Sequence, residues 1–233
     1  MKATAIIAAY NEENTIEGVI RALRQSPRIG EIIVVSDGST DRTTEIARAA
    51  GVRTLALSSN CGKGYAMRLG VRHATSDILF FVDGDMLNLS EEHIGSLVDP
   101  VVSGDCDMNV GVRHRDPIRD FLHVRAGFGP ILSGIRVMHR GLFETVPIQF
   151  MSRFKIEAAL NYFCEQGGYV QKNTVIHGLG HVIKENKRGF SSGLAARWTM
   201  SFEVSLLLID LYMVGSWRWT EFVDQPVPDY EIH

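Results

Sequence analysis

Two carboxylates, Asp83 and Asp85, follow directly on an apolar run, Ile78–Val82, and one glycine separates them. Side chains alternate along an extended chain, so both carboxylates are expected to point the same way. Neighbouring carboxylates repel each other, and a cation beside them relieves that repulsion. A hard divalent cation such as Mg²⁺ or Mn²⁺, itself holding a phosphate, suits this chemistry. A simple turn is the structural alternative, because Asp and Gly are common turn residues.

The apolar run before the carboxylates is short, aromatic and β-branched, which is typical of a strand buried on both faces of a parallel sheet. Similar runs occur earlier at Thr4–Ala9, Ile32–Ser36 and Val52–Leu57. Helical segments lie between them, the first with Asn14 as its expected N-cap and the last from Lys63 to Ala74. This alternation predicts right-handed βαβ units and a mostly parallel sheet.

Ligands of such sheets bind outside the carboxyl ends of the strands, where three further loops are expected to arrive. Gly62 and Gly64 allow close approach to the backbone, and Lys63 between them adds a positive charge. Together with the exposed N–H groups at a helix start, they make a phosphate site. Tyr10 could stack on a base, and Asp37 could accept a hydrogen bond from one.

Each of these residues also has an ordinary structural explanation. Asp37 and Asp41 could cap a helix, Glu12 could favour a helix dipole, and Lys63 could be a solvated charge. Taken together with the carboxylate pair, a nucleoside diphosphate site is the better interpretation. The chain has neither G-x-G-x-x-G nor G-x-x-x-x-G-K-[ST], which argues against a dinucleotide oxidoreductase and a P-loop NTPase.

Four segments, in order, resemble the family-2-type glycosyltransferases of the GT-A fold. They are Ala9-Tyr10-Asn11-Glu12-Glu13, Val34-Val35-Ser36-Asp37-Gly38-Ser39-Thr40-Asp41, Asn60-Cys61-Gly62-Lys63-Gly64 and Phe81-Val82-Asp83-Gly84-Asp85. The resemblance covers roughly the first 90 residues. Ala9 stands where the family commonly has proline. The implied fold is a single Rossmann-like α/β domain with a mostly parallel central sheet and flanking helices.

The resemblance also implies roles for individual residues. Ala8, Tyr10 and Glu12 would line the nucleoside pocket, and Asp37 would read the base. Lys63 would lie near the sugar nucleotide, while Asp83 and Asp85 would serve the nucleotide and a Mn²⁺ or Mg²⁺ ion. Asp85 would be the main metal ligand and would stabilise the leaving diphosphate.

The second half of the chain is expected to bind the acceptor. Ser133-Gly134-Ile135-Arg136 resembles the Ser-Gly-φ-Arg segment of the polyprenyl-phosphate glycosyltransferases, where φ is hydrophobic and the arginine lies near phosphates. Arg136 suits this role because arginine binds phosphate in a bidentate way. The preceding basic segment, from Arg113 to Arg125, is either a solvated face or an anion site.

Two further segments carry candidate residues. Glu157, near the start of a predicted helix, matches an acidic position that related enzymes place near the acceptor, where it could take a proton from a hydroxyl. A helix-terminal glutamate that pairs with Lys155 is the alternative. His177-Gly178-Leu179-Gly180-His181-Val182-Ile183-Lys184 resembles a φ-x-H-x-x-K segment, with His181 towards the metal and Lys184 towards the phosphates.

Composition limits the remaining possibilities. A net charge of −3 gives no electrostatic basis for binding nucleic acid. Three cysteines without a CxxC pair favour a reducing, cytoplasmic setting. Residues 191–214 are predicted to form an amphipathic helix, too short in its apolar part to span a membrane, which takes about 20 apolar residues. Trp217 and Trp219 would then pack in the core or a homodimer, or anchor the protein peripherally at the inner membrane face.

The sequence thus predicts a single catalytic domain with a nucleotide-sugar half (1–89), an acceptor half (90–190) and a C-terminal helix and tail (191–233). Such a domain would move a hexose, with inversion, from a UDP- or GDP-sugar to a phosphate-bearing acceptor such as polyprenyl phosphate. A small soluble acid, glycerate or phosphoglycerate as in glucosyl-phosphoglycerate synthase-like enzymes, is the alternative acceptor. A nucleotide-sugar-binding module and a nucleotidyltransferase remain open as other classes of function.

Overall fold

The computed structural model describes residues 1–113, 133–151, 155–181 and 229–233. Within them, one large sheet has the strand order β10-β3-β2-β1-β4-β7-β6-β8. Its strands are β1 (Ala3–Ala9), β2 (Ile29–Ser36), β3 (Arg53–Leu57), β4 (Ile78–Asp83), β6 (Met108–Arg113), β7 (Arg136–His139), β8 (Gln171–Ile176) and β10 (Tyr230–Ile232). A second, two-stranded sheet pairs β5 (Met86–Leu87) with β9 (Gly180–His181).

The first four strands of the chain are all parallel, with β1 in the middle, between β2 and β4. On the far side of β4 the direction changes, because β7 is antiparallel to β4 and β6 is antiparallel to β7. At the opposite edge, β10 adds an antiparallel strand to β3. The predicted fold class, a mostly parallel sheet built from βαβ units, is confirmed.

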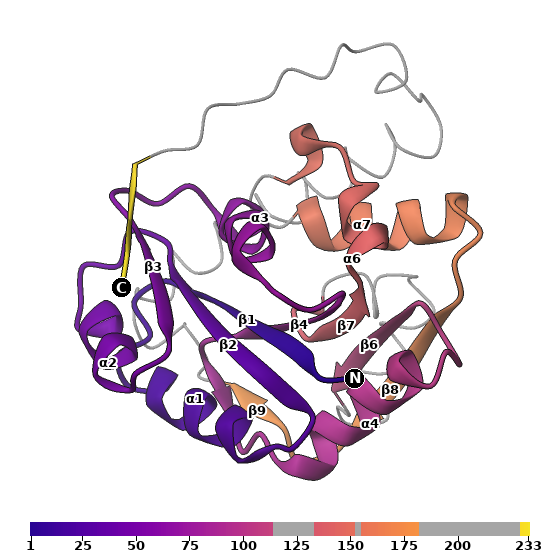
Figure 1. Ribbon diagram of the computed structural model, residues 1–233, viewed down its shortest axis with the longest axis horizontal. Coiled ribbons are helices and arrows are strands. Elements are labelled where there is room, and N and C mark those ends of the chain that lie inside the picture. The colour runs from indigo at the N-terminus through magenta and orange to yellow at the C-terminus, as the bar shows by residue number, and fades with distance from the viewer. Residues whose placement is uncertain (114–132, 152–154, 182–228) are drawn as a thin grey trace, which may run out of the picture.

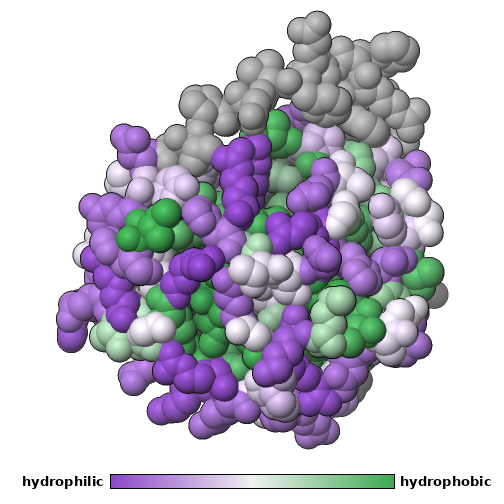
Figure 2. Space-filling model, viewed as in Figure 1, coloured by the Kyte–Doolittle hydropathy of each residue, from purple (hydrophilic) through white to green (hydrophobic). Residues whose placement is uncertain are grey.

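Helices cover both faces of the sheet (Figure 1). One face carries α1 (Ile16–Gln25), α2 (Thr43–Ala49) and α4 (Glu91–Val102), and the other carries α3 (Lys63–His73), α6 (Arg140–Glu144) and α7 (Lys155–Gln166). A 3₁₀ turn, η1 (Ile148–Phe150), precedes α7. On the side seen in Figure 2, hydrophilic residues cover most of the described surface, with hydrophobic residues in separate patches.

Two hydrophobic cores explain why the central strands are apolar throughout. Ile6 and Phe81 pack in the core beneath α3 and α7, whereas Ile7 and Phe80 pack in the core beneath α1 and α4. All four side chains are at most 1% exposed. Burying a side chain of this size contributes about 1.5–3 kcal/mol, so a central strand gains on both faces.

The element boundaries differ from the predicted ones at several points. The predicted N-cap Asn14 is wrong: Thr15 holds that position, and it makes no side-chain cap. Its hydroxyl donates instead to the carbonyl oxygen of Gly84 (2.7 Å), which joins the start of α1 to the loop after β4. The predicted helix over 191–214, Trp217 and Trp219 lie outside the described residues. Among the helices that are described, none has the length and apolarity needed to cross a membrane.

Candidate active site

The carboxyl ends of β1, β2 and β4 bring the predicted site residues together. Ala8, near the end of β1, is in register with Val35 on one side and Asp83 on the other. The N–H of Asp37 donates to the carbonyl of Ala9 (2.8 Å). The loop after β1 is further joined to the first residue of α2, where the N–H of Glu12 donates to Thr43 Oγ1 (2.7 Å). Glu12 is buried and Tyr10 is half-buried at this edge.

Asp37 connects β2 to the loop before α3. Its Oδ1 accepts the N–H of Cys61 (2.7 Å), and its Oδ2 accepts the N–H of Gly62 (2.9 Å). The side chain is buried. Burial raises the pKa of Asp37 above its ordinary value, although the two backbone N–H groups act in the opposite direction. The carboxyl group is held by two directed hydrogen bonds, one to each oxygen.

Lys63, the first residue of α3, bridges two carboxylates. Its Nζ lies 2.5 Å from Asp83 Oδ1 and 2.6 Å from Glu157 Oε1. Burial by itself would lower the pKa of Lys63, but the two carboxylates raise it above its ordinary value. The ammonium group therefore stays charged and joins the end of β4 to helix α7.

Gly134, just before β7, leaves the space that this ion pair occupies. A Cβ atom at Gly134 would lie 2.0 Å from Asp83 Oδ2 and 2.4 Å from Lys63 Nζ. Both distances are far below van der Waals contact, so a side chain here would displace the carboxylate or the ammonium. The sequence pointed to this segment through its arginine and did not single out the glycine.

Arg136 lies inside the protein, 0% exposed. Its guanidinium donates to the carbonyl of Ser133 (2.6 Å), the carbonyl of Glu157 (3.3 Å) and Asn161 Oδ1 (3.3 Å). Burial lowers its pKa, against the charges of Glu157 and Asp83. Through these hydrogen bonds Arg136 holds the first half of α7 to the segment before β7. Contact of Arg136 with an acceptor phosphate stays a prediction. Asn161, in the interior of that helix, carried no signal in the sequence.

Asp85 is only 8% exposed and directly precedes the short strand β5. The pairing of Met86 with His181 brings the backbone of His181 next to the residue that follows Asp85. Among the described residues, no group of three or more His, Cys, Asp and Glu side chains is arranged to hold a metal ion. Mg²⁺ is commonly bound by one or two carboxylates together with substrate phosphates, so Asp85 and Asp83 fit an ion that arrives with a diphosphate.

Some predicted residues fall outside the structural description. Lys184 and the basic residues from His114 to Arg125 lie in the segments 182–228 and 114–132. Their proposed contacts with phosphates stay predictions.

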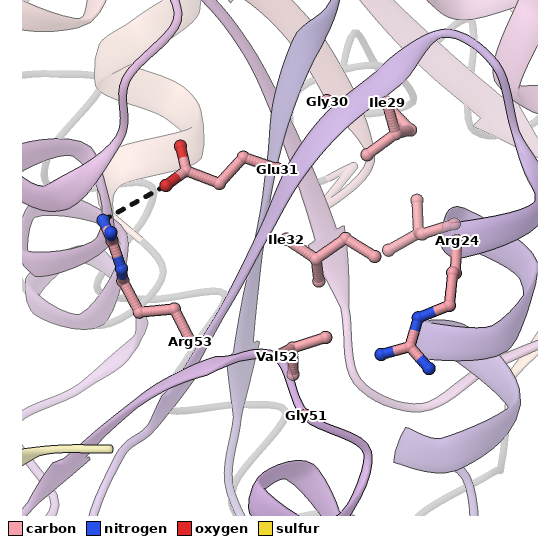
Figure 3. A pocket seen from close by; sticks show the side chains of 9 residues that line it. Arg24, Ile29, Gly30, Glu31, Ile32, Gly51, Val52 and Arg53 are labelled. Carbon is pink, nitrogen blue, oxygen red and sulfur yellow. Dashed lines mark ion pairs between the residues drawn. The ribbon is translucent and has the colours of Figure 1, made fainter.

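A shallow hollow of about 430 Å³ lies at the opposite, amino-terminal edge of the sheet (Figure 3). It is lined by the end of α1 and the beginnings of β2 and β3, including Arg24, Glu31 and Arg53. Glu31 Oε1 pairs with Arg53 (3.1 Å), and Glu31 Oε2 accepts from Thr4, from the backbone of Thr75 and from its hydroxyl. These polar groups are used within the protein, and none of the predicted site residues lines the hollow.

The fold and the polar edge define an α/β protein with an arrangement suited to a nucleoside diphosphate. The chain belongs to glycosyl transferase family 2, whose model matches residues 4–160. The predicted family and its GT-A fold are thereby confirmed.

Curated relatives include two 4,4'-diaponeurosporenoate glycosyltransferases. The one from Staphylococcus haemolyticus (strain JCSC1435) is 38% identical over 96 residues, 39% of this chain and 25% of the relative. The one from Staphylococcus aureus (strain bovine RF122 / ET3-1) is 28% identical over 149 residues, 61% of this chain and 39% of the relative. The matched region is thus well under half of either relative.

Similar solved structures include glucosyl-3-phosphoglycerate synthase from Mycobacterium tuberculosis. Its complex with Mn²⁺, UDP-glucose and glycerol 3-phosphate has a TM-score of 0.74 at 25% identity, over 90% of this chain and 79% of that chain. Its complex with Mg²⁺ and UDP has a TM-score of 0.73 at 25% identity, over the same shares.

Proposed function

We propose that this chain transfers a sugar from a nucleoside diphosphate sugar to an acceptor that already carries a negative charge. The observation that carries the proposal is the meeting of Asp37, Lys63, Asp83 and Asp85 at one edge of the sheet. A base is bound by hydrogen-bonding groups, a diphosphate by positive charge and a divalent cation by carboxylates. All three kinds of group occur at this edge of the sheet.

The donor would lie across the ends of β1, β2 and β4. Ala8, Tyr10 and Glu12 would line the nucleoside, and Asp37 would lie close to the base. Lys63 would face the diphosphate, and Asp83, Asp85 and His181 would hold the metal ion, with Lys184 at the phosphates. Mn²⁺ or Mg²⁺, when bound, supplies positive charge that stabilises the leaving diphosphate. The complexes of the mycobacterial synthase with UDP and either ion support both the donor class and the metal.

The state of Glu157 bears on the acceptor. Glu157 is 3% exposed, and its carboxylate is held by Lys63 at 2.6 Å. As a general base it would need contact with an acceptor hydroxyl, which this pairing obstructs. An acceptor whose attacking atom is a phosphate oxygen is already an anion and needs no base, whereas an acceptor that attacks through a hydroxyl still has a proton to lose. Inversion at the anomeric carbon remains the predicted stereochemical outcome.

Acceptors that carry acid groups occur among the similar proteins. The mycobacterial synthase was crystallised with glycerol 3-phosphate, and the curated relatives are named for 4,4'-diaponeurosporenoate. A molecule with an acid group is common to these names and to the polyprenyl phosphate favoured by the Ser133–Arg136 segment. We propose this shared chemistry for the present chain.

A transfer assay with radiolabelled UDP-glucose and GDP-mannose tests the function. Detergent-solubilised polyprenyl phosphate, 3-phosphoglycerate, glycerate and uncharged glycerol are offered as acceptors, each with Mn²⁺ and with EDTA. We expect metal-dependent release of nucleoside diphosphate with one of the two phosphorylated acceptors. Release with glycerate alone would contradict a phosphate-bearing acceptor but not a charged one. Release with uncharged glycerol and with none of the three charged acceptors would contradict the proposal itself.

The assay also separates the other classes of function. A binding module would bind the donor without releasing nucleoside diphosphate under any condition. A nucleotidyltransferase would release pyrophosphate from a nucleoside triphosphate and a sugar phosphate. A thermal-shift panel of UDP- and GDP-sugars with and without Mn²⁺ identifies the base, because a ligand at 100 times its Kd stabilises the native state by about 2.7 kcal/mol. Cytoplasmic location, peripheral contact with the inner membrane face and a homodimer remain predictions.

A further inference from the structure

Helix α3 begins without a side-chain cap of its own. Its N-cap is Gly62, which has a positive φ of 94° and makes no side-chain cap hydrogen bond. The first N–H groups of a helix lack partners within the helix, and they carry its positive partial charge. Lys63 follows at the first helical position, where a second positive charge is unfavourable. The start of α3 therefore depends on negative charge from elsewhere in the fold.

Asp37, the residue after β2, brings a carboxylate to the N-cap residue Gly62 and to Cys61 before it. One carboxylate oxygen takes the N–H of Cys61 and the other takes the N–H of Gly62, at 2.7 and 2.9 Å. Hydrogen bonds to an ionised acceptor are about twice as strong as neutral ones. The same side chain therefore orients both peptide groups that lead into Lys63.

The backbones of the two loops are also in direct contact. Gly38, with φ +69°, lies so close to the next loop that a Cβ there would be 2.4 Å from the carbonyl carbon of Ser59. It would be 2.5 Å from the backbone nitrogen of Asn60. The loop before α3 therefore rests on the Asp37–Gly38 turn.

Lys63 occupies a position that requires accurate placement. Its ammonium lies between Asp83 and Glu157, at 2.5 and 2.6 Å, in a space that Gly134 leaves open. A small change in the path of residues 61–62 would shift the origin of the lysine side chain relative to two carboxylates on other elements.

We infer that Asp37 is a positioning residue that sets the start of α3 through the N–H groups of Cys61 and Gly62 and thereby places Lys63 at the diphosphate. The inference rests on the proposed function for the ligand of Lys63, and it differs from a direct reading of the base by Asp37. A base reader discriminates between nucleotides, whereas a positioning residue acts on every donor through Lys63.

A double-mutant cycle on the full chain distinguishes these roles. Binding of UDP and GDP with Mn²⁺ is measured by calorimetry for the wild type, Asp37→Asn, Lys63→Ala and the double variant. We expect Asp37→Asn to weaken both nucleotides by a similar factor of about 10 or more, because asparagine keeps only one acceptor oxygen. In the Lys63→Ala background the same substitution should have little effect, since coupled residues are not additive. A changed ratio between UDP and GDP, with additive effects, would overturn the inference.

Amide hydrogen exchange without any ligand gives a second readout. In Asp37→Asn, exchange at Cys61 and Gly62 should accelerate about 10-fold or more while the amides of β1 keep their protection. Asp37→Glu, which keeps the charge, should restore part of that protection. Unchanged exchange at Cys61 and Gly62 would refute the inference even if nucleotides bind. If wild type binds neither nucleotide, the proposed function fails while this exchange result still decides the role of Asp37.

Asp41→Asn is the matched control. Asp41 accepts the N–H groups of Glu13 (3.1 Å) and Thr43 (3.0 Å) at the same sheet edge, without contact to the loop before α3 in the hydrogen bonds described. We expect exchange at Cys61 and Gly62 to be the same in this variant as in the wild type. Acceleration there would show that any lost carboxylate at this edge loosens the loop, and would count against a specific role of Asp37.

Discussion

At Lys63, one ammonium group serves two carboxylates from distant parts of the chain. Asp83 ends β4 and Glu157 lies in the first turn of α7, and both approach Lys63 Nζ within 2.6 Å. Glu157 is buried while Lys63 and Asp83 are partly exposed, so removing Lys63 would leave the Glu157 carboxylate as an uncompensated buried charge. The positive charge of Lys63 therefore balances one carboxylate at the end of β4 and one on α7.

Asp85 is the residue on which the metal assignment depends. Asp85→Ala should remove the Mn²⁺-dependent part of UDP binding, by at least about 10–100-fold, because outer-shell partners alone are worth that much at metal sites. Calorimetric titration of UDP with Mn²⁺ and with EDTA measures it. Asp77→Ala, at the exposed opposite end of β4, is the control and should bind as wild type. Unchanged Mn²⁺ dependence in Asp85→Ala would remove Asp85 from the metal site.

At Gly134, a single added methyl group would disturb the ion pair between Lys63 and Asp83. Gly134→Ala would place its Cβ 2.0 Å from Asp83 Oδ2, 2.6 Å from Asp83 Cγ and 2.4 Å from Lys63 Nζ, so the ion pair must shift. We expect the free energy of unfolding to fall by about 1–3 kcal/mol, the usual cost of overpacking. Donor affinity should fall about 10-fold or more, because the charges that face the diphosphate are displaced.

Gly141→Ala is the matched control for Gly134, since a Cβ at Gly141 meets nothing within 4 Å. Urea unfolding and UDP titration of both variants check the pair of predictions. A Gly134→Ala variant that binds UDP as well as Gly141→Ala does would show that the Lys63–Asp83 pair plays no part in donor binding.

At the scale of elements, α3 is the helix that connects the site to the central sheet. Its first residue carries the ammonium group, and Gly70 in its last turn packs on β1. A Cβ at Gly70 would lie 2.4 Å from Ile6 Cγ2, a buried methyl group in the middle of the core. The close approach of α3 to β1 is therefore possible only because residue 70 lacks a side chain.

Gly70→Ala should destabilise the protein by about 1–3 kcal/mol, the usual effect of overpacking a core, despite alanine's better helix propensity. Gly18→Ala, in α1 with nothing within 4 Å of its Cβ, should instead stabilise by roughly 0.5–1 kcal/mol. Chemical denaturation of both variants measures the two values. If Gly70→Ala proved as stable as Gly18→Ala, the close packing of α3 on β1 would be refuted.

At the scale of the whole molecule, the carboxyl ends and the amino ends of the parallel strands carry different kinds of polar groups. The carboxyl ends carry the candidate site, while Glu31 at the amino ends joins Thr4 of β1, Arg53 of β3 and Thr75 before β4. Burial alone would raise the pKa of Glu31, but the hydrogen bonds from Thr75 and Thr4 and the charge of Arg53 lower it below its ordinary 4.5. Glu31 therefore contributes stability at neutral pH that depends on its ionisation.

The sign of this contribution predicts its pH dependence. Because the folded-state pKa lies below the unfolded value, the stabilisation is complete well above pH 4.5 and is lost as the pH falls through the lowered pKa. Glu31→Gln should therefore be less stable than wild type at pH 7, with the difference shrinking towards pH 3. Urea unfolding across this range measures it, with Glu17→Gln, at an exposed position of α1, as the control for charge removal. A difference that grows on acidification would contradict the assignment.

Local chemistry in the sequence predicted the first four strands, their parallel direction and the sheet edge to which the loops carrying Asp37, Lys63, Asp83 and Asp85 lead. A strand with a continuous apolar run is stable only when both of its faces are buried. Strands joined by βαβ connections are parallel, so their carboxyl ends all lie at the same edge of the sheet. Contacts between residues far apart in the chain could not be read in this way. Only the tertiary structure shows Glu157 on Lys63, Arg136 turned inward to Ser133 and Asn161, and Gly134 against Asp83. These three contacts depend on the register of β7 in the sheet and on the position of α7 against it. Packing between distant segments decides both, so no local pattern in the sequence specifies them.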